Sequence, residues 1–384
     1  MGFRAIITGL LFSITALVKA QVPKVGTDTT LDICNWNIEW FGDSINGPSN
    51  ENTQLNNAVT VLKSMDMDIY GLCEISNPGY WQKLQDALPD YGAVITTFTQ
   101  TQKTALMYKK SMFKMLYSKS ILLAFDFEFA SGRFPLEVAL EWDNNWKKDT
   151  LYCWVIHLKS NIGTTAEKQS AYDRRAKAAE ELKKYIDAKK RWKGVVLGDW
   201  NDDLDISIFS SKASPFLAWR NDTNYIFPSY RLSLNRSKST ASYAEMIDHQ
   251  VFTPRLKWHW DRVSSGVMVG DAYIGSYRYN TSDHYPVWSR LRFTSNEPSP
   301  AMNGEEFGVF GVGHRLPVYW SNGAFMAYGN MAITLGESVI TVRDVSGREL
   351  LKTGLGEQVD LASGIYFLEI KKNNLVKLGK IWIP

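Results

Sequence analysis

"VVLGDWNDDLD", residues 195–205, joins a short apolar run to a dense group of polar side chains. The run predicts a buried strand, and after Gly198 it gives way to acids and an amide: Asp199, Asn201, Asp202 and Asp203. Carboxylates are costly to bury unless they are paired or bind a cation. The stretch therefore indicates that other side chains converge on the end of this strand.

A calcium-binding loop is one interpretation of the stretch, because acids and amides alternate from Asp199 onward. An EF-hand loop requires Gly at its sixth position and Glu at its twelfth. Leu204 and Ser210 occupy those two positions, so the stretch does not fit an EF-hand.

Strand-like and helical patterns alternate around this stretch, from residue 31 to residue 293. Helices are predicted at residues 51–65 and 166–193. Strands are predicted at "LDICNWNI" (31–38), "DIYGLCEI" (68–75), "KTALMY" (103–108), "FPLEVALEW" (134–142), "TLYCWVIHL" (150–158), "GVVLGD" (194–199), "IDHQVFT" (247–253) and "YPVWSRLRF" (285–293). The mixture predicts an α/β (α+β) domain with two packed sheets.

The two ends of the chain have a different character. Residues 1–20, "MGFRAIITGLLFSITALVKA", predict a signal peptide cleaved after Ala20, since the apolar run is shorter than the ~20 residues of a membrane span. Residues 21–30 form a lead-in, and residues 294–305, with two prolines, predict a linker. Residues 306–384 predict a small all-β, sandwich-like module with turns at Ser346-Gly347 and Asn373-Asn374. No other stretch is long and apolar enough to predict a membrane span.

Charge and cysteine content narrow the function classes. The formal charge is +3, and removal of Arg4 and Lys19 with the signal peptide lowers it to +1. Overall charge therefore gives no case for nucleic-acid binding, and any attraction for phosphate must be local. The three cysteines, an odd and sparse set in apolar runs, predict buried free thiols at Cys34, Cys73 and Cys153.

Polar side chains follow several of the other predicted strands as well. They are Asn37 and Glu39, Glu74, His157, Asp248, and the pair Asp283 and His284. Each alone is typical of a solvated or structural residue, but together they suit hydrolysis of a phosphate ester. Carboxylates hold Mg²⁺, which neutralises phosphate charge. A histidine oriented by an aspartate can activate water, and amides with a second histidine can donate to phosphate oxygens.

Six motifs, "WNIEW", "CEI", "IHLKS", "GDWND", "IDHQVF" and "SDHYPV", occur in this order along the chain. In this the sequence resembles the endonuclease/exonuclease/phosphatase superfamily, which includes pancreatic-type deoxyribonucleases, sphingomyelinases and inositol polyphosphate phosphatases. The resemblance covers residues 31–293 and implies a four-layer αββα sandwich of two packed mixed sheets.

The resemblance also implies roles for eight residues. Asn37 and Glu74 would bind the metal, Mg²⁺ or Mn²⁺, with Glu74 as the principal ligand and Ca²⁺ as an alternative structural ion. Asp283 would complete the site as a second metal ligand. His157 would contact the scissile phosphate, with Asp199 and Asn201 beside it to orient water or phosphate. His284 would act as general base, with Asp248 bonded to its ring.

Some positions depart from the pancreatic-type deoxyribonucleases. Phe134 stands where those enzymes carry an acid that supports the first catalytic histidine, and Ser76 stands where they carry an arginine. Lys159 and Asn161 are further candidates to face phosphate. Arg133 and Lys103 are weaker candidates, for which a surface or structural charge is the favoured interpretation. His249, His259 and His314 are interpreted as structural or exposed.

The last 55 residues resemble the sorting domain of the type IX secretion system. This implies export by the signal peptide, passage through outer-membrane secretion machinery, and a secreted or cell-surface enzyme. We expect a metal-dependent phosphodiesterase acting on extracellular nucleic acid, with DNA favoured. A same-fold phosphatase or a sphingomyelinase-type enzyme is one alternative, although Trp258 and Trp260 are interpreted as core residues and not as a membrane-contact hairpin. A non-catalytic surface-binding protein is the other. The sequence predicts no oligomeric state.

Overall fold

The computed structural model describes residues 20–143, 148–189, 192–210, 212–293, 318–321, 324–327, 339–344, 348–354, 357–362, 364–372 and 375–383. The chain divides into two compact units, Met1–Ser295 and Asn296–Pro384. The predicted linker and all but the last residue of the predicted signal peptide lie outside the described residues. Those two assignments therefore stay predictions.

Two mixed sheets form the body of the first unit. The first sheet has the order β10 (Trp260–Val267), β11 (Val287–Leu291), β1 (Leu31–Phe41), β2 (Ile69–Ile75), β4 (Lys103–Lys109) and β3 (Tyr91–Ile95). The second has the order β5 (Phe113–Ser120), β6 (Leu136–Asp143), β7 (Lys148–His157), β8 (Lys193–Asp199) and β9 (Asp248–Phe252). β1 is parallel to β2, and β7 is parallel to β8, so pairs of carboxyl ends lie together in each sheet.

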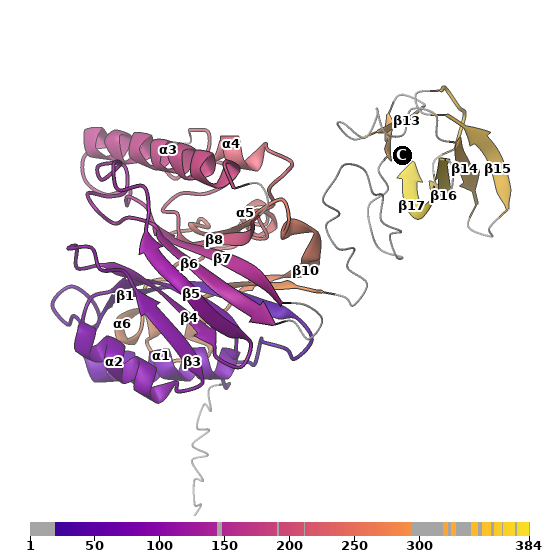
Figure 1. Ribbon diagram of the computed structural model, residues 1–384. Coiled ribbons are helices and arrows are strands. Elements are labelled where there is room, and N and C mark those ends of the chain that lie inside the picture. Colours follow the sequence, from indigo (N-terminus) through magenta and orange to yellow (C-terminus); the bar gives the residue numbers. More distant parts are fainter. Residues whose placement is uncertain are drawn as a thin grey trace, which may run out of the picture. The chain divides into compact units, whose positions relative to one another are not determined.

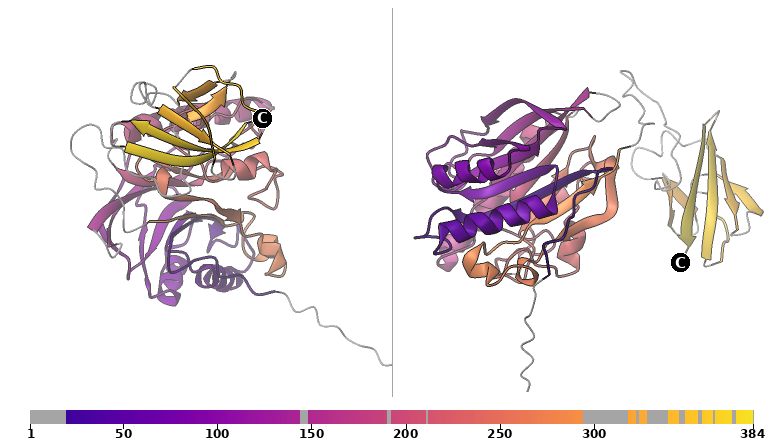
Figure 2. Two further views of the ribbon diagram at one scale, coloured as in Figure 1. Left: turned by 90° about the vertical axis from the view of Figure 1, so that its right-hand side faces the viewer. Right: turned by 90° about the horizontal axis from the view of Figure 1, so that it is seen from below.

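Helices cover the outer face of each sheet, as Figures 1 and 2 show. α1 (Glu51–Met65) and α2 (Pro78–Ala87) pack on the first sheet, where Val61, Leu62 and Met65 share an apolar cluster with Trp36 and Tyr70. α3 (Thr165–Asp187) packs on the second sheet through a separate cluster. The remaining helices are short: α4 (Leu217–Arg220), α5 (Tyr230–Leu234), η1 (Lys257–His259), η2 (Gly270–Ala272) and α6 (Tyr277–Asn280). The predicted four-layer αββα sandwich is confirmed.

The sheets meet across a core that is apolar in the middle and polar toward one end. Gly71 is required here, because a Cβ on it would lie 2.7 Å from the Leu197 side chain. Nearer the end, Asn35 donates to the carbonyl of Gly198 at 3.1 Å, and Gln250 donates to the Asn35 amide oxygen at 3.0 Å. These buried amides lock the two sheets together beside the ends of β1 and β8.

Some element boundaries differ from the prediction. α3 ends at Asp187 and not near residue 193, because Trp192 leaves the helix and stacks on Tyr152 at 3.7 Å between ring centroids. β3, β5 and β10 were not predicted. The strands predicted at 103–108 and 134–142 lie in different sheets, each antiparallel to its own neighbours. Cys34, Cys73 and Cys153 are buried and free, as predicted.

The second unit is all-β in its described residues, which confirms the predicted class. Its main sheet has the order β15 (Glu349–Thr353), β14 (Val339–Arg343), β16 (Gly364–Lys372) and β17 (Leu375–Ile383), all antiparallel. β12 (Val318–Ser321) and β13 (Ala324–Ala327) form a separate pair. Across the described residues of the whole chain, no helix has the length and apolar character that a membrane span needs.

Candidate active site

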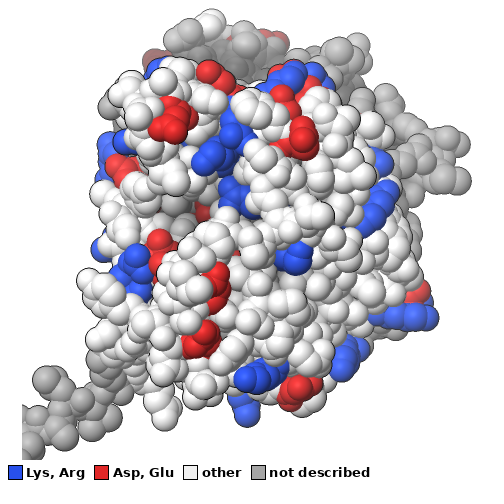
Figure 3. Space-filling view, turned by 90° about the vertical axis from the view of Figure 1, so that its left-hand side faces the viewer, with Lys and Arg blue, Asp and Glu red and all other residues white. Residues whose placement is uncertain are grey.

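The carboxyl ends of β1, β2, β7 and β8 lie at the left-hand end of the sandwich in Figure 1, the end that Figure 3 shows face-on. Acidic and basic side chains gather around a hollow on this face (Figure 3). All eight residues predicted for the site lie at this end, linked by the contacts described below. These side chains converge on the end of β8, as the acids after Gly198 predicted.

Glu74 is held in a defined orientation at the end of β2. Its two oxygens accept hydrogen bonds from the Asn37 side-chain amide at 3.0 Å and from the backbone N–H of Trp40 at 2.9 Å. The pairing register shifts in both β1 and β2 at this point, and Glu39, Trp40 and Glu74 have φ of 42°, 47° and 64°. Residues other than glycine rarely adopt this backbone conformation, and such strained residues are concentrated at functional sites. The local backbone thus turns Glu74 into the site.

Asp199 lies directly beside Glu74. The Asn37 amide nitrogen donates to Asp199 at 3.1 Å as well as to Glu74, so one amide bridges the two carboxylates. Asp199 also accepts from the backbone N–H of Asn201 at 2.9 Å. Gly198 precedes it with φ +137°, and a Cβ there would lie 2.1 Å from the carbonyl of Ile156. Burial raises the pKa of Asp199 to about 7.

Only part of the polar group after β8 belongs to the site. Asn201 lies beside Asp199, and its amide donates to the carbonyl of Leu158 at 3.1 Å. Trp200 is fully buried in the core. Asp202 pairs with Arg175 of α3 at 2.8 Å, and Asp203 accepts from the backbone of Met246 at 2.9 Å. The latter two carboxylates stabilise the loop and do not face the site.

His284 and Asp248 form the opposite wall. His284 Nδ1 lies 2.8 Å from Asp248 Oδ2, and Asp248 is completely buried. Burial lowers the pKa of His284, but the charges of Asp248, Asp283 and Asp199 outweigh it and raise the pKa well above its usual value. The ring's Nε2 lies 3.9 Å from Asp199 Oδ2 and 3.9 Å from Asp283 Oδ1. His284 therefore faces both carboxylates with the nitrogen that Asp248 leaves free.

His157 closes the space between Glu74 and Asp199. Its Nε2 lies 3.6 Å from Glu74 and 3.4 Å from Asp199. Arg133 NH1 lies 2.9 Å from Nδ1 and 2.8 Å from Nε2 of the same ring. Burial, and after it the charge of Arg133, hold the pKa of His157 well below its usual value. His157 is therefore a neutral imidazole.

Arg133, a weaker candidate in the sequence, is not a surface charge. Only 5% of the residue is exposed, and its guanidinium contacts a predicted site residue. No neighbouring motif marks it, because the contact depends on a loop that brings residue 133 back to the end of β7. Lys103 is bonded to the carbonyls of Phe98 and Gln100, which fits a structural charge. Phe134, beside Arg133, packs against the apolar cluster under α3.

Glu39, which the sequence placed among the polar side chains at strand ends without a role, and Arg278, which was not predicted, also lie at the site. Arg278 NH1 donates to both oxygens of Glu39, at 2.8 and 2.9 Å. Burial, and then the charge of Asp283, raise the pKa of Glu39 to about 7. Glu39 occurs in the "WNIEW" motif, so the sequence contained a signal for it. Arg278 comes from the short α6 and had none.

The interpretation of Trp258 as a core residue is also wrong, since 61% of it is exposed. Trp260 is partly buried and packs against the cluster between the sheets. Trp258 lies in η1, before β10, whose first residue is paired with Leu291 and so with the start of β1. That is the end of the sandwich opposite the site. His249 is fully buried and bonded to Ser229 and the carbonyl of Asp202, as a structural histidine.

The side chains fit a divalent cation. Glu74, Glu39 and Asp283 place carboxylates around one space, and Mg²⁺ prefers such oxygen ligands. The pKa of Glu39 is raised in part because negative charges crowd here, and a cation would relieve this. Among the described residues, Asp199, Asp248 and His284 also present ligand atoms within 4.8 Å of one another. His284 already uses Nδ1 on Asp248, and the Asn37 amide joins Glu74 to Asp199, so the ligand set stays a prediction.

Comparisons with known proteins agree with this geometry. The chain matches the model of the Endonuclease/Exonuclease/phosphatase family over residues 34–284, a range that includes all eight predicted site residues. No curated protein matches the chain.

Three solved structures illustrate the similarity of fold. TDP2 from D. rerio, complexed with a single strand DNA product, is 17% identical with a TM-score of 0.52, and covers 69% of this chain and 100% of its own. A humanized D. rerio TDP2 with 14 mutations is 16% identical with a TM-score of 0.50, covering 69% and 99%. A mannosyl-6-phosphatase from Bacteroides thetaiotaomicron is 15% identical with a TM-score of 0.49, covering 68% and 100%. The chain belongs to the endonuclease/exonuclease/phosphatase family, whose members are metal-dependent phosphoester hydrolases.

Proposed function

We propose that this chain is a secreted phosphodiesterase that uses Mg²⁺ or Mn²⁺ to hydrolyse nucleic acid. The observation that carries the proposal is that two groups of side chains face each other across one space. Glu74 and His157 lie on one side, and His284 with its buried partner Asp248 lies on the other. Asp199 lies between them, within 3.4 Å of His157 and 3.9 Å of His284.

Proton transfer is assigned to the side of His284. Asp248 holds the ring by Nδ1, and Nε2 and Asp199 face the same space, where a water molecule would bind. Because the raised pKa of His284 keeps its ring protonated, Asp199 is the member of this pair that accepts the proton of the attacking water, and Nε2–H of His284 keeps that water oriented toward phosphorus. Asn201, bonded to Asp199 and to the carbonyl of Leu158, keeps that carboxylate in place.

The negative charge of the phosphate is compensated by groups on the side of Glu74 and His157. A neutral His157 can donate one hydrogen bond to a phosphate oxygen, because one of its ring nitrogens carries a proton. Glu74, with Asn37 and Asp283 as further ligands, would hold a Mg²⁺ or Mn²⁺ ion, which would supply charge neutralisation and stabilise the leaving oxygen.

Nucleic acid is the substrate that we favour. The D. rerio TDP2 structure of similar fold was determined with a single strand DNA product, which supports this choice. A sphingomyelinase-type activity would need exposed apolar side chains near the site to contact a membrane. Trp258 is exposed, but it lies at the opposite end of the sandwich and does not supply that contact. Ile45 and Ile162 are exposed in the segments that follow β1 and β7, so the substrate panel below has to decide this alternative.

A substrate panel tests the proposal. Protein comprising residues 21–384 should cleave plasmid DNA or RNA with Mg²⁺, and EDTA should abolish the cleavage. Sphingomyelin and sugar phosphates, tested in parallel, should be poor substrates. Hydrolysis of either of these without cleavage of nucleic acid would reject the nuclease and keep the phosphoesterase.

We also propose that residues 306–384 direct the enzyme through a type IX secretion system after the signal peptide directs export. The motifs of the last 55 residues and their all-β character support this. Deletion of residues 306–384 in the native host should leave the catalytic unit folded and active in the periplasmic fraction. Appearance of the truncated protein in the medium at the wild-type level would contradict the sorting role.

A further inference from the structure

Arg133 is a buried cation, and no carboxylate among the described residues forms an ion pair with it. Its NH1 contacts His157 and the Gln102 side chain at 3.0 Å, and its NH2 donates to the carbonyl of Leu158 at 2.9 Å. Its Nε is buried and has no hydrogen-bond partner. A buried guanidinium without a paired anion is unfavourable, so a folded protein retains one only where something compensates for it.

The backbone that places Arg133 is strained. Ala130, Ser131 and Gly132 immediately precede it, with φ of 54°, 62° and 103°. The Gln100 side-chain amide donates to the carbonyls of Ala130 and Ser131 and so stabilises this turn. Three consecutive residues in the left-handed region are disfavoured, and strain of this kind marks positions that the surrounding structure must hold.

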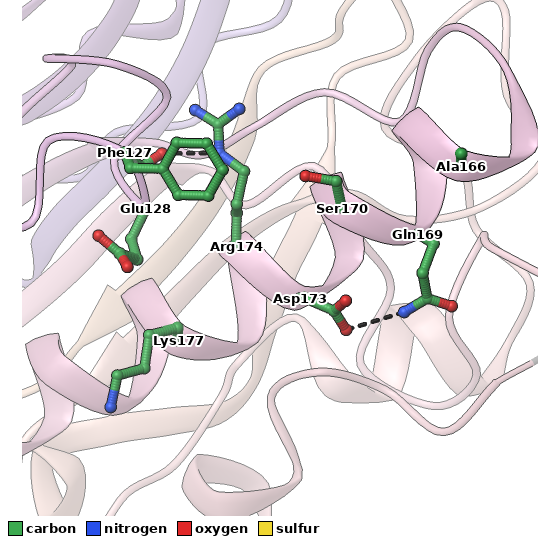
Figure 4. Close-up of a pocket in the computed structure, with 8 residues that line it drawn as sticks. All are labelled: Phe127, Glu128, Ala166, Gln169, Ser170, Asp173, Arg174 and Lys177. Atoms are coloured by element: carbon green, nitrogen blue, oxygen red, sulfur yellow. Dashed lines mark hydrogen bonds between the residues drawn. The ribbon is translucent and has the colours of Figure 1, made fainter.

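Arg174 of α3 also stabilises this loop. The Arg174 guanidinium lies 4.2 Å from the ring centroid of Phe127, and Arg174 donates to the carbonyl of Phe127 at 2.6 Å and to Ser131 Oγ at 3.1 Å. Figure 4 shows this stacking at the edge of a surface pocket between α3 and the loop. The pocket mixes Glu128 and Asp173 with Lys177, so its charges favour no single ligand. The contacts between residues that line the pocket instead hold in place the loop that carries Arg133.

The nearest full charges of opposite sign are those of the active site. Glu74 and Asp199 both attract Arg133, and both lie within 3.6 Å of the His157 ring that Arg133 contacts. Arg133 NH1 lies 2.9 Å from Nδ1 and 2.8 Å from Nε2 of His157, so the contact fixes where the ring lies and selects neither tautomer. Arg133 therefore determines the position of the ring.

We propose that Arg133 is a positioning residue for phosphoester hydrolysis. It holds the His157 imidazole in place beside Glu74 and Asp199 and adds fixed positive charge behind the ring. A phosphate group is the anion that compensates for this buried cation. The inference concerns hydrolysis of any phosphoester by this site, and it does not require nucleic acid to be the substrate.

Substitution of Arg133 separates this role from a structural one. Arg133→Met keeps the apolar stem and removes the charge. It should lower kcat about 10²-fold or more on whichever of plasmid DNA and bis(4-nitrophenyl) phosphate the wild type hydrolyses, and it should weaken binding of inorganic phosphate about tenfold. The thermal midpoint should stay or rise, because an uncompensated buried charge is removed. Lys177→Met, which removes an exposed cation from the neighbouring helix surface, should change none of these quantities.

Chemical rescue provides the second measurement. In Arg133→Ala, millimolar guanidinium should restore part of kcat, whereas ammonium at the same concentration should not. His157→Asn, whose amide can donate, should retain more activity than His157→Ala. A lower thermal midpoint for Arg133→Met with unchanged kcat and phosphate affinity would overturn the proposal and make Arg133 purely structural. Equal activities of the two His157 variants would overturn the donor role.

Discussion

His284 Nδ1 lies 2.8 Å from Asp248 Oδ2, while the other oxygen of this buried carboxylate has no hydrogen-bond partner. Asp248 reaches this place because β9 is antiparallel to β8, which sets Asp248 directly opposite Asp199. The pairing register alone therefore brings two carboxylates to one imidazole. A completely buried carboxylate with one unsatisfied oxygen contributes little to stability. Its value lies in orienting His284.

Asp248→Asn tests this orientation. An amide cannot stabilise a protonated imidazole as a carboxylate does, so kcat should fall about 10²- to 10⁴-fold. The free energy of unfolding should stay the same or increase, because a poorly satisfied buried charge is removed. Activity assays and denaturant unfolding on the same preparation measure both. Asp261→Asn, at the far end of the sandwich, is the matched control, and a similar loss of kcat there would count against the assignment.

Removal of the principal metal ligand should uncouple the protein from the metal. The wild-type thermal midpoint should rise when Mg²⁺ or Mn²⁺ is added to EDTA-treated protein, because a ligand that binds only the folded state stabilises it. Glu74→Gln should abolish this rise and lower kcat. Glu141→Gln, an exposed carboxylate paired with Lys148, should behave as the wild type. A full metal-dependent rise in the Glu74 variant would move the metal site elsewhere, for instance to Asp199, Asp248 and His284.

The buried pair of Arg175 and Asp202 should be a major determinant of stability. Two guanidinium nitrogens lie 3.1 and 2.8 Å from one Asp202 oxygen, and both residues are fully buried. Breaking such a pair leaves an uncompensated buried charge, so Arg175→Met should lower the free energy of unfolding by about 3–5 kcal/mol. The exposed pair of Lys177 and Glu180 on the same helix gives the contrast. Lys177→Met should cost at most about 1 kcal/mol, and equal costs would refute the distinction.

The sequence predicted those parts of the site that follow directly from strand ends. Asp199 and His157 come last in buried strands, so the layered fold and the convergence of these side chains could be inferred together. Asp202 carries the same local signal as Asp199, yet it turns to Arg175. Only the path of the loop decides between the two positions, and no local pattern encodes that path.

Arg133 was only a weaker candidate, and Arg278 was missed, for a related reason. Neither follows a strand, and each reaches the site from a connecting segment: Arg133 through the turn at 130–132, Arg278 from the four-residue helix α6. Strand β3 was missed because it is only five residues long, and β5 and β10 were missed because their sequences lack clear alternation or continuous apolar runs. β5 is exposed over most of its length, and so carries little hydrophobic signal.

His249 should make the folded state sensitive to acid. It is fully buried, and burial lowers its pKa to about 4 from the usual 6.5. Between these two values the unfolded chain binds a proton that the folded protein does not, so stability increases with pH over this interval. The contribution is complete above pH 6.5 and is lost as the pH falls toward 4. At 1.36 kcal/mol for each pKa unit, it amounts to about 3 kcal/mol.

His249→Gln removes this titration while it keeps a side chain able to bond Ser229 and the carbonyl of Asp202. Other ionisable groups, including Asp199 and Glu39, titrate in both proteins and cancel in the comparison. The free energy of unfolding, measured by urea denaturation between pH 4 and 7, should therefore fall less steeply on acidification in the variant. Parallel curves for the two proteins would mean that His249 is protonated in the folded state, which its burial opposes.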